Sequence, residues 1–262
     1  MGMRTRNARR SLTHRLGSAA WPLDNCAGIC LTELMIAMAA GAVVLSAAVQ
    51  TLTHFQQRLW TQHDAIARHQ DLRIGMEVME SELRLAGTGA LPFSQALLKA
   101  EQQEVEFLAN LGGLATTLTK PVSPSQSELT VHDGSDWSKG KRVVVCRSDL
   151  CVEGRLALDG QRHTLNLIEP IGQMFPTGSL VYVSNQVRYY LEKDRHGRSS
   201  LMRQVDGGAN SLIGDMARFQ LAYLGNDGKP THDPALVARV RVDVAVGDGR
   251  RTVTSEVGLR GR

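Results

Sequence analysis

The stretch ICLTELMIAMAAGAVVLSAAV, residues 29 to 49, decides the fold of this chain of 262 residues. These 21 residues carry one charge, that of Glu33, and otherwise consist of apolar and small residues. A helix rises about 1.5 Å per residue, so a helix of this length covers a bilayer core of about 30 Å. We therefore predict a membrane-spanning helix over residues 29–49.

Glu33 is the residue in this span that needs an explanation. An acidic side chain inside a membrane span costs roughly 2.5 to 3.5 kcal/mol on insertion scales, so it indicates a functional site with a specific partner. The alternative is that Glu33 lies at the level of the lipid headgroups, where its charge costs little. On the first interpretation the partner must be a cation within reach of the start of the helix.

The basic character of the chain resides in residues 1–28. The whole chain has 30 Lys and Arg against 26 Asp and Glu. Five of these arginines and one aspartate lie in residues 1–28, which therefore carry the entire net charge of +4. The remaining residues are neutral, which gives no reason to expect nucleic acid as a partner. Arginines beside an apolar span instead hold that end in the cytoplasm and send the following residues across the membrane.

Two other kinds of leader fit these residues less well. A secretory signal has a shorter apolar run, followed by a small-x-small cleavage site. A lipoprotein signal has apolar and small residues before its cysteine, whereas Asp24 and Asn25 precede Cys26, and Ile29 precedes Cys30.

The apolar pattern becomes amphipathic after residue 49. The chain has no proline between Ile29 and Ala90, so we predict one continuous helix that ends at Gly87, with Gly75 as its weak point. Its second half, residues 50–87, should lay an apolar stripe on a sheet. The stripe consists of Leu52, Phe55, Leu59, Ile66, Leu72, Met76, Met79, Leu83 and Ala86. The opposite, solvated face consists of Gln56, Gln57, Arg58, Arg68, Asp71, Arg73, Glu77, Glu80, Glu82 and Arg84.

Residues 88–262 have the alternating pattern of strands, separated by Asp-Gly and related turns. This pattern predicts an α+β fold in which the long helix packs on a mainly antiparallel sheet with one core. We expect strands over 103–109, 127–132, 141–146, 155–158, 163–168, 179–193, 200–205, 216–224, 236–246 and 251–259.

The cysteines form two groups. Cys26 and Cys30 precede or begin the span, whereas Cys146 and Cys151 lie in the β-rich region with four residues between them. In an exported domain the second pair predicts a disulfide that closes a short hairpin. A zinc site would need two further ligands, and no suitably spaced pair of Cys or His stands nearby.

The sequence contains no motif that predicts catalysis or a cofactor. It lacks the nucleophile elbow, the zincin helix, the phosphate-binding loop and the Cys-x-x-Cys motif. His63 and His69 are six residues apart, on different faces of a helix, and the acidic turns do not follow the calcium-loop pattern. We therefore expect neither an enzyme nor a bound cofactor or metal.

Gly28 followed by ICLTELMI resembles the processing signal of type IV pilins and type II secretion pseudopilins. In that family a prepilin peptidase cuts after a glycine, the new first residue is methylated, and the fifth is a glutamate. Ile29 replaces the usual phenylalanine at the first position. The segments VYV at 181–183, VRYYL at 187–191, LMR at 201–203 and FQLAYL at 219–224 resemble large minor pilins of the PilW type and, less closely, J-type minor pseudopilins.

The resemblance implies a role for each residue of the signal. Gly28 precedes the cut, residues 1–28 are the cleaved leader, Ile29 is N-methylated, and Glu33 neutralises the terminal amine of a neighbouring subunit during assembly. The implied partners are the prepilin peptidase, other pilins or pseudopilins and, before assembly, inner-membrane lipid. The body is expected in the periplasm, and later in a pilus or pseudopilus. The alternatives are a pseudopilin of a type II secretion system and a membrane-anchored binding module that does not polymerise.

Overall fold

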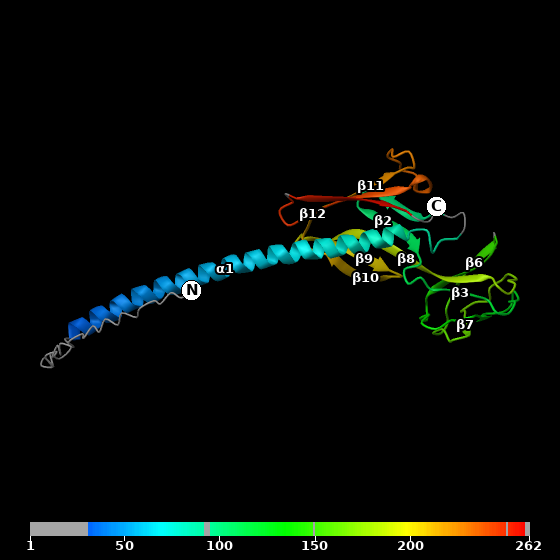
Figure 1. Ribbon diagram of the computed structural model, residues 1–262, viewed down its shortest axis with the longest axis horizontal. Coiled ribbons are helices and arrows are strands. Elements are labelled where there is room, and N and C mark those ends of the chain that lie inside the picture. Colours follow the sequence, from blue (N-terminus) through cyan, green and yellow to red (C-terminus); the bar gives the residue numbers. More distant parts are fainter. Residues whose placement is uncertain (1–30, 92–94, 149, 250, 260–262) are drawn as a thin grey trace, which may run out of the picture. The chain divides into compact units, whose positions relative to one another are not determined.

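A computed structural model describes residues 31–91, 95–148, 150–249 and 251–259 (Figure 1). These residues fall into two compact units, the first ending at Arg58 and the second beginning at Leu59. One helix, α1 (Leu31–Arg84), contributes to both units. The structure thus has the predicted α+β composition, a long apolar N-terminal helix and a mostly antiparallel β-sheet region.

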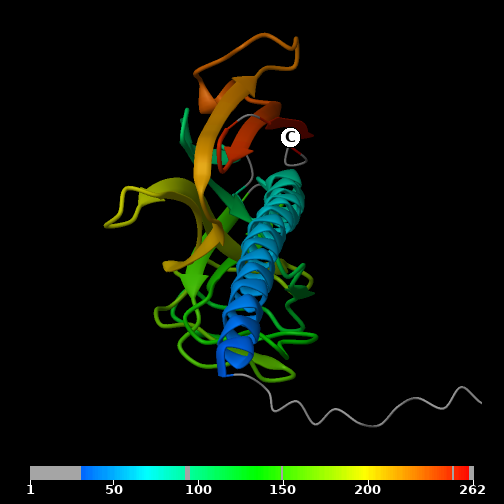
Figure 2. The same ribbon diagram turned by 90° about the vertical axis from the view of Figure 1, so that its left-hand side faces the viewer.

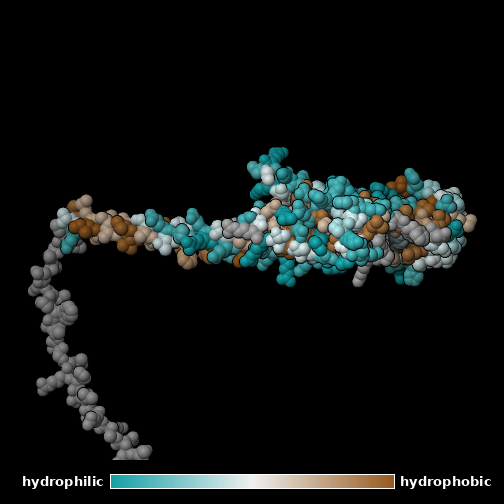
Figure 3. Space-filling view, turned by 90° about the horizontal axis from the view of Figure 1, so that it is seen from above, coloured by the Kyte–Doolittle hydropathy of each residue, from teal (hydrophilic) through white to brown (hydrophobic). Residues whose placement is uncertain are grey.

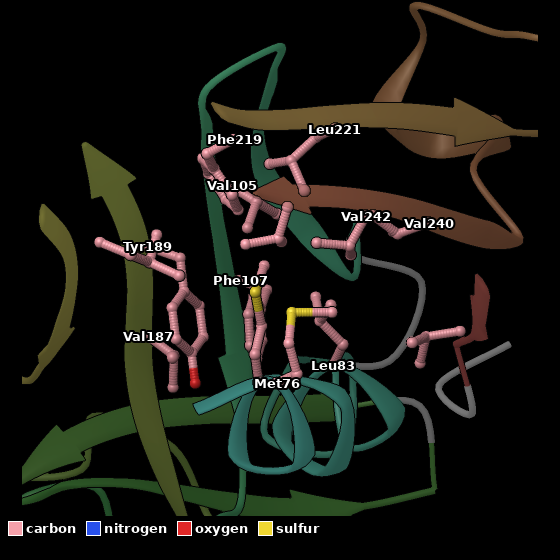
Figure 4. Packing of buried hydrophobic residues seen from close by; sticks show 14 of the residues in the cluster. Met76, Leu83, Val105, Phe107, Val187, Tyr189, Phe219, Leu221, Val240 and Val242 are labelled. Carbon is pink, nitrogen blue, oxygen red and sulfur yellow. The ribbon is translucent and has the colours of Figure 1, made fainter. Parts of the chain in front are cut away.

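The second part of α1 packs on the strands, as the spacing of its apolar residues predicts (Figure 2). Met76 and Leu83 point from α1 toward Phe107 and the surrounding core (Figure 4). The buried part of the predicted stripe begins at Leu72, because Leu52, Phe55, Leu59 and Ile66 are 46 to 64% exposed. The helix ends at Arg84, three residues before the predicted end, and Gly87 (φ 90°) turns the chain toward the sheet.

One long strand organises the sheet region. Strand β8 (Leu180–Lys193) pairs along its second half with β2 and β9, and along its first half with β3 and β5. The eight-stranded sheet comprises β8 with β1 (Leu97–Glu101), β2 (Glu104–Ala109), β3 (Ala115–Thr117), β5 (Arg142–Arg147), β6 (Leu150–Arg155), β9 (Ser199–Val205) and β10 (Gly208–Ile213).

Two smaller sheets and a short helix complete the second unit. The three-stranded sheet has the order β11 (Met216–Leu224), β12 (Arg239–Val246) and β13 (Thr252–Gly258). The two-stranded sheet consists of β4 (Glu128–Thr130) and β7 (Thr164–Asn166), and η1 (Pro234–Leu236) is a single 3₁₀ turn.

The prediction of one core is wrong, because the second unit has two. The first core lies between α1, β2, the second half of β8, β9 and the three-stranded sheet. The second core is built entirely from residues between Leu118 and Val183. Since β2 and β8 pair directly, with Ala109 opposite Asn185, residues 110–184 form a lobe inserted between two strands of one antiparallel pair. We call this segment the inserted lobe.

All ten predicted strands overlap an observed strand, and the discrepancies have physical causes. The predicted range 155–158 shares only Arg155 with β6, and β1, β3 and β10 were not predicted. Strands β6 and β10 contain glycine and polar residues, because both lie toward the margin of the sheet and are only partly buried. Their alternation of apolar and polar residues is therefore weak.

The structure also corrects the position of Glu82, which we predicted on the solvated face of the helix. Its carboxylate is buried and is bound by Arg203, whose Nε lies 3.1 and 3.0 Å from the two carboxylate oxygens. The Tyr189 hydroxyl donates a further hydrogen bond to Glu82. Burial and the adjacent carboxylate raise the pKa of the Tyr189 phenol, so it stays a hydrogen-bond donor. Glu82 thus ties α1 to strands β8 and β9.

Gly75, the predicted weak point, lies directly against β10. A Cβ atom at this position would lie 2.4 Å from Cγ1 and 2.7 Å from Cδ1 of Ile213, which is buried. The glycine therefore allows close packing. In the helix it costs about 1 kcal/mol relative to alanine.

We expect Gly75→Ala to lower the free energy of unfolding by about 1 to 2 kcal/mol, because overpacking a core outweighs the gain in helix propensity. Chemical denaturation of the purified protein measures this change. Gly214→Ala is the matched control, since a Cβ atom there meets nothing within 4 Å. Combination with Ile213→Ala should remove the clash, so the two changes together should cost less than their sum. An unchanged or raised stability of Gly75→Ala would contradict this account.

Candidate functional site: the exposed apolar helix

The first part of α1 exposes an apolar surface that a soluble protein would bury. Between Leu31 and Phe55 its large apolar side chains are each more than half exposed. They gather on the first part of the helix in the space-filling view (Figure 3). These residues are Leu31, Leu34, Met35, Ile36, Met38, Val43, Val44, Leu45, Val49, Leu52 and Phe55. Contiguous apolar patches of this kind mark contact with lipid or with another protein.

The polar side chains in the same segment bond back to the helix. The Ser46 hydroxyl donates to the Ala42 carbonyl, and Thr51 Oγ1 donates to the Ala47 carbonyl at 2.8 Å. Thr53 Oγ1 donates to the Val49 carbonyl at 3.1 Å. Such bonds satisfy hydroxyl groups without water, as an apolar environment requires. In the described part of the chain, α1 is the helix long and apolar enough to span a membrane.

Glu33 lies in the first turn of α1, and within the described residues no group pairs with its carboxylate. The positive end of the helix dipole favours a carboxylate there by about 0.3 to 1 kcal/mol. This gain is smaller than the roughly 2.5 to 3.5 kcal/mol that an acidic residue costs in a membrane span. A cation beside Glu33 would offset the remaining cost, and the described residues place none there.

The predicted processing residues Gly28 and Ile29 lie outside the described residues, as do Cys26 and Cys30. Cleavage after Gly28 and methylation of Ile29 therefore stay predictions. Among Gly28, Ile29 and Glu33, the structure describes Glu33, which lies near the start of the exposed apolar segment.

The structure places the predicted pair Cys146 and Cys151 at disulfide distance. The two residues are opposite each other in the β5–β6 hairpin, with Cα atoms 4.1 Å and Sγ atoms 1.96 Å apart. So small a ring contributes about 2 kcal/mol on the chain-entropy model. The pair stabilises the end of a hairpin in the inserted lobe and lies far along the chain from Glu33.

An open groove of about 700 Å³ adjoins this disulfide. Two of its hydroxyl groups bond to the protein: Thr88 Oγ1 donates to the Leu85 carbonyl at 2.7 Å, and the Tyr182 hydroxyl to the Ala90 carbonyl at 2.8 Å. Burial raises the pKa of the Tyr182 phenol, which disfavours a phenolate. The described residues that line the groove include no histidine, aspartate or glutamate that could act as a base beside a nucleophile. Among the described residues, no group of three or more His, Cys, Asp or Glu side chains could hold a metal.

Two basic residues at the start of β5 have acidic partners within the fold. Lys141 Nζ lies 2.8 Å from an oxygen of Asp206, and Arg142 Nη1 lies 3.9 Å from an oxygen of Glu153. These contacts partly offset the positive charge that a phosphate backbone would need.

No family model, curated protein or solved structure matches this chain. The functional argument therefore rests on the residues and their arrangement. We predicted that Leu52, Phe55, Leu59 and Ile66 pack on the sheet, but the structure leaves all four exposed. Their spacing of three, four and seven residues predicts one face, but does not tell which surface covers that face.

Proposed function

We propose that this protein is a minor pilin-like structural subunit that assembles through α1 into a type IV pilus, as an initiation or tip component. The observation that carries the proposal is the length of the exposed apolar surface on α1. Residues 29–49 already fill a bilayer core of about 30 Å. The exposed stripe continues from Leu52 to Ile66, which lipid does not cover. Neighbouring helices offer a suitable surface for it.

Glu33 has a role in the same scheme. Cleavage after Gly28 by a prepilin peptidase would create an ammonium group at Ile29, and methylation keeps this group basic. The carboxylate of one subunit would pair with the terminal amine of its neighbour, which sets the register of adjacent helices. Pairing matters because a buried charge without a partner is destabilising by about 3 to 5 kcal/mol. Before assembly the helix would lie in the inner membrane, with the second unit in the periplasm.

The same features support a second candidate, a minor pseudopilin of a type II secretion system. It would use the same cleavage, helix and partners, and would differ in the machine it joins. A membrane-anchored binding module that does not polymerise is less well supported, because an anchor has no use for the apolar stripe between Leu52 and Ile66.

Blocking the cleavage separates an assembling subunit from a simple anchor. We expect Gly28→Val to leave the chain inserted in the membrane, with its leader uncut, and to remove it from the sheared pilus or isolated pseudopilus fraction. Immunoblots of membrane and fibre fractions measure both outcomes. Gly214→Ala, at a position where a Cβ atom meets nothing within 4 Å, serves as the control and should behave as wild type. An uncut chain that enters fibres at the wild-type level would refute the proposal, and a wild-type chain present in membranes but absent from the pilus and pseudopilus fractions would favour the anchor.

A further inference from the structure

Strand β13 ends the three-stranded sheet and leaves one edge open. It pairs with β12 from Arg239↔Gly258 to Ala245↔Thr252, and no other described strand pairs with it. The Leu259 amide donates to the Ala238 carbonyl at 2.9 Å. In an antiparallel ladder this bond and the register fix which residues face β12. The bonds to β12 are made by the amides and carbonyls of Val253, Ser255 and Val257. The amides and carbonyls that point away from β12 are those of Thr252, Thr254, Glu256 and Gly258.

The other described sheet edges of five or more residues are interrupted or covered. Strand β1 has a bulge between Leu97 and Lys99, and β10 has one between Ser211 and Ile213. The Arg155 carbonyl at the edge of β6 accepts from the Ile168 amide at 2.8 Å.

The outer edge of β11 is covered in the same way. The Leu221 amide donates to the Gln102 carbonyl at 2.8 Å, and the Tyr223 carbonyl accepts from the Thr231 amide at 2.9 Å. Bulges, coverage and charge are the devices by which proteins protect sheet edges. In the described structure β13 has no bulge, and no other segment covers its outer edge.

The side chains of β13 do not protect the edge either. The sequence TVTSEVG has no proline and no lysine, and its one charged residue is Glu256. That carboxylate is neutralised by Arg239 Nη1 at 2.9 Å and Arg241 Nη2 at 3.2 Å. Val253 lies opposite the buried Val244, on the core side of the sheet, yet is 43% exposed. A further strand beside β13 would cover it.

We propose that the outer edge of β13 binds an extended strand of another protein chain, which adds to the sheet β11-β12-β13. The alternating outward amides and carbonyls are the complement of an extended backbone. The added segment would carry apolar side chains on the core side, beside Val253. On the other side, beside Thr252 and Thr254, it would carry uncharged polar side chains.

A second copy of this chain does not fit the edge. The turn between β12 and β13 lies beside Ala65 and His69 of α1. The helix and the sheet that contains β13 therefore pack against each other. Antiparallel pairing of two β13 strands reverses, in the second copy, the direction of the part of α1 that packs on the strands, whereas subunits that assemble through this helix keep it parallel. Parallel pairing of the same two edges turns one copy over and places its polar face beside the core side of the other. A different chain has neither restriction.

Amide hydrogen exchange of the full chain, resolved to single residues, tests this proposal in native membranes and after extraction into detergent. Strand addition predicts an alternating result. The outward amides of Thr252, Thr254, Glu256 and Gly258 should exchange at least about tenfold more slowly in membranes. The inward amides of Val253, Ser255 and Val257 should be slow in both preparations. Thr254→Pro removes an outward amide and should abolish the protection at Glu256 and Gly258.

Thr254→Val is the control, because it loses the same hydroxyl as Thr254→Pro but keeps the amide, and it should retain the protection. Thr254→Lys places a charge on the edge and should also abolish protection, even if the proline variant does not fold. Equal exchange of the outward amides in the two preparations would overturn the proposal, as would slowing of all β13 amides together. Either result leaves the pilin-like function standing, since that function is tested separately by the cleavage after Gly28.

Discussion

Replacement of Glu33 by glutamine is expected to remove the protein from assembled fibres while it remains in the membrane. The change keeps the size of the side chain and removes its charge, so the amine at Ile29 of the neighbouring subunit would be buried without a partner. Loss of one member of a buried ion pair is destabilising by about 3 to 5 kcal/mol. Since each 1.4 kcal/mol is a factor of about ten, the fraction of chain in fibres should fall at least about tenfold.

Glu77→Gln is the matched control for Glu33→Gln. Glu77 belongs to the same helix and pairs with Arg73 at 3.0 Å, but both side chains are largely exposed. Exposed pairs of this kind contribute about 0.3 to 0.5 kcal/mol, so this variant should enter fibres normally. Quantitative immunoblots of sheared fibres and of carbonate-washed membranes measure both variants. Entry of Glu33→Gln at the wild-type level would show that the carboxylate has no part in assembly.

Loss of the Glu82 carboxylate should produce the largest fall in folding stability. In Glu82→Ala the Arg203 guanidinium and the Tyr189 hydroxyl keep their partly buried positions and lose their common acceptor. We expect a loss of about 2 to 4 kcal/mol, because an uncompensated charge and a hydroxyl without an acceptor both become costly. Thermal unfolding of the purified chain, followed by near-ultraviolet circular dichroism, measures the change.

Two further variants test this explanation. Glu80→Ala removes a partly exposed pair, in which Arg84 Nη2 lies 3.0 Å from the carboxylate, and should change stability by less than about 1 kcal/mol. The double variant Glu82→Met with Arg203→Met removes both charges, and should recover much of the loss, since apolar replacements of buried pairs are often neutral. A double variant as unstable as the sum of the two single changes would contradict the coupling.

The sequence predicted what local periodicity can specify. The helix, the burial of Leu72, Met76, Met79 and Leu83, and the long strand β8 all follow from spacing of apolar residues. The spacing of the cysteines likewise predicted the pair that the structure places at disulfide distance. Each of these features depends on residues that are near one another in the chain.

The features that sequence analysis missed depend on residues far apart in the chain. Glu82 follows a polar pattern locally, and its partner Arg203 is 121 residues away. The two cores arise because β2 pairs with β8 across the inserted lobe, a contact that no turn signal records. The close packing at Gly75 depends on Ile213 of β10, a strand whose own pattern is weak. The burial of Glu82, the two cores and the packing at Gly75 all depend on long-range pairing, which local propensity does not predict.

The measurement that tests the central claim most directly is the mass of the N-terminal peptide of the protein extracted from membranes of cells with an active prepilin peptidase. A processed pilin-like subunit predicts a chain that begins at N-methyl-Ile29 and has lost residues 1–28. A chain that retains this leader, or one cut at any other bond, would contradict the account.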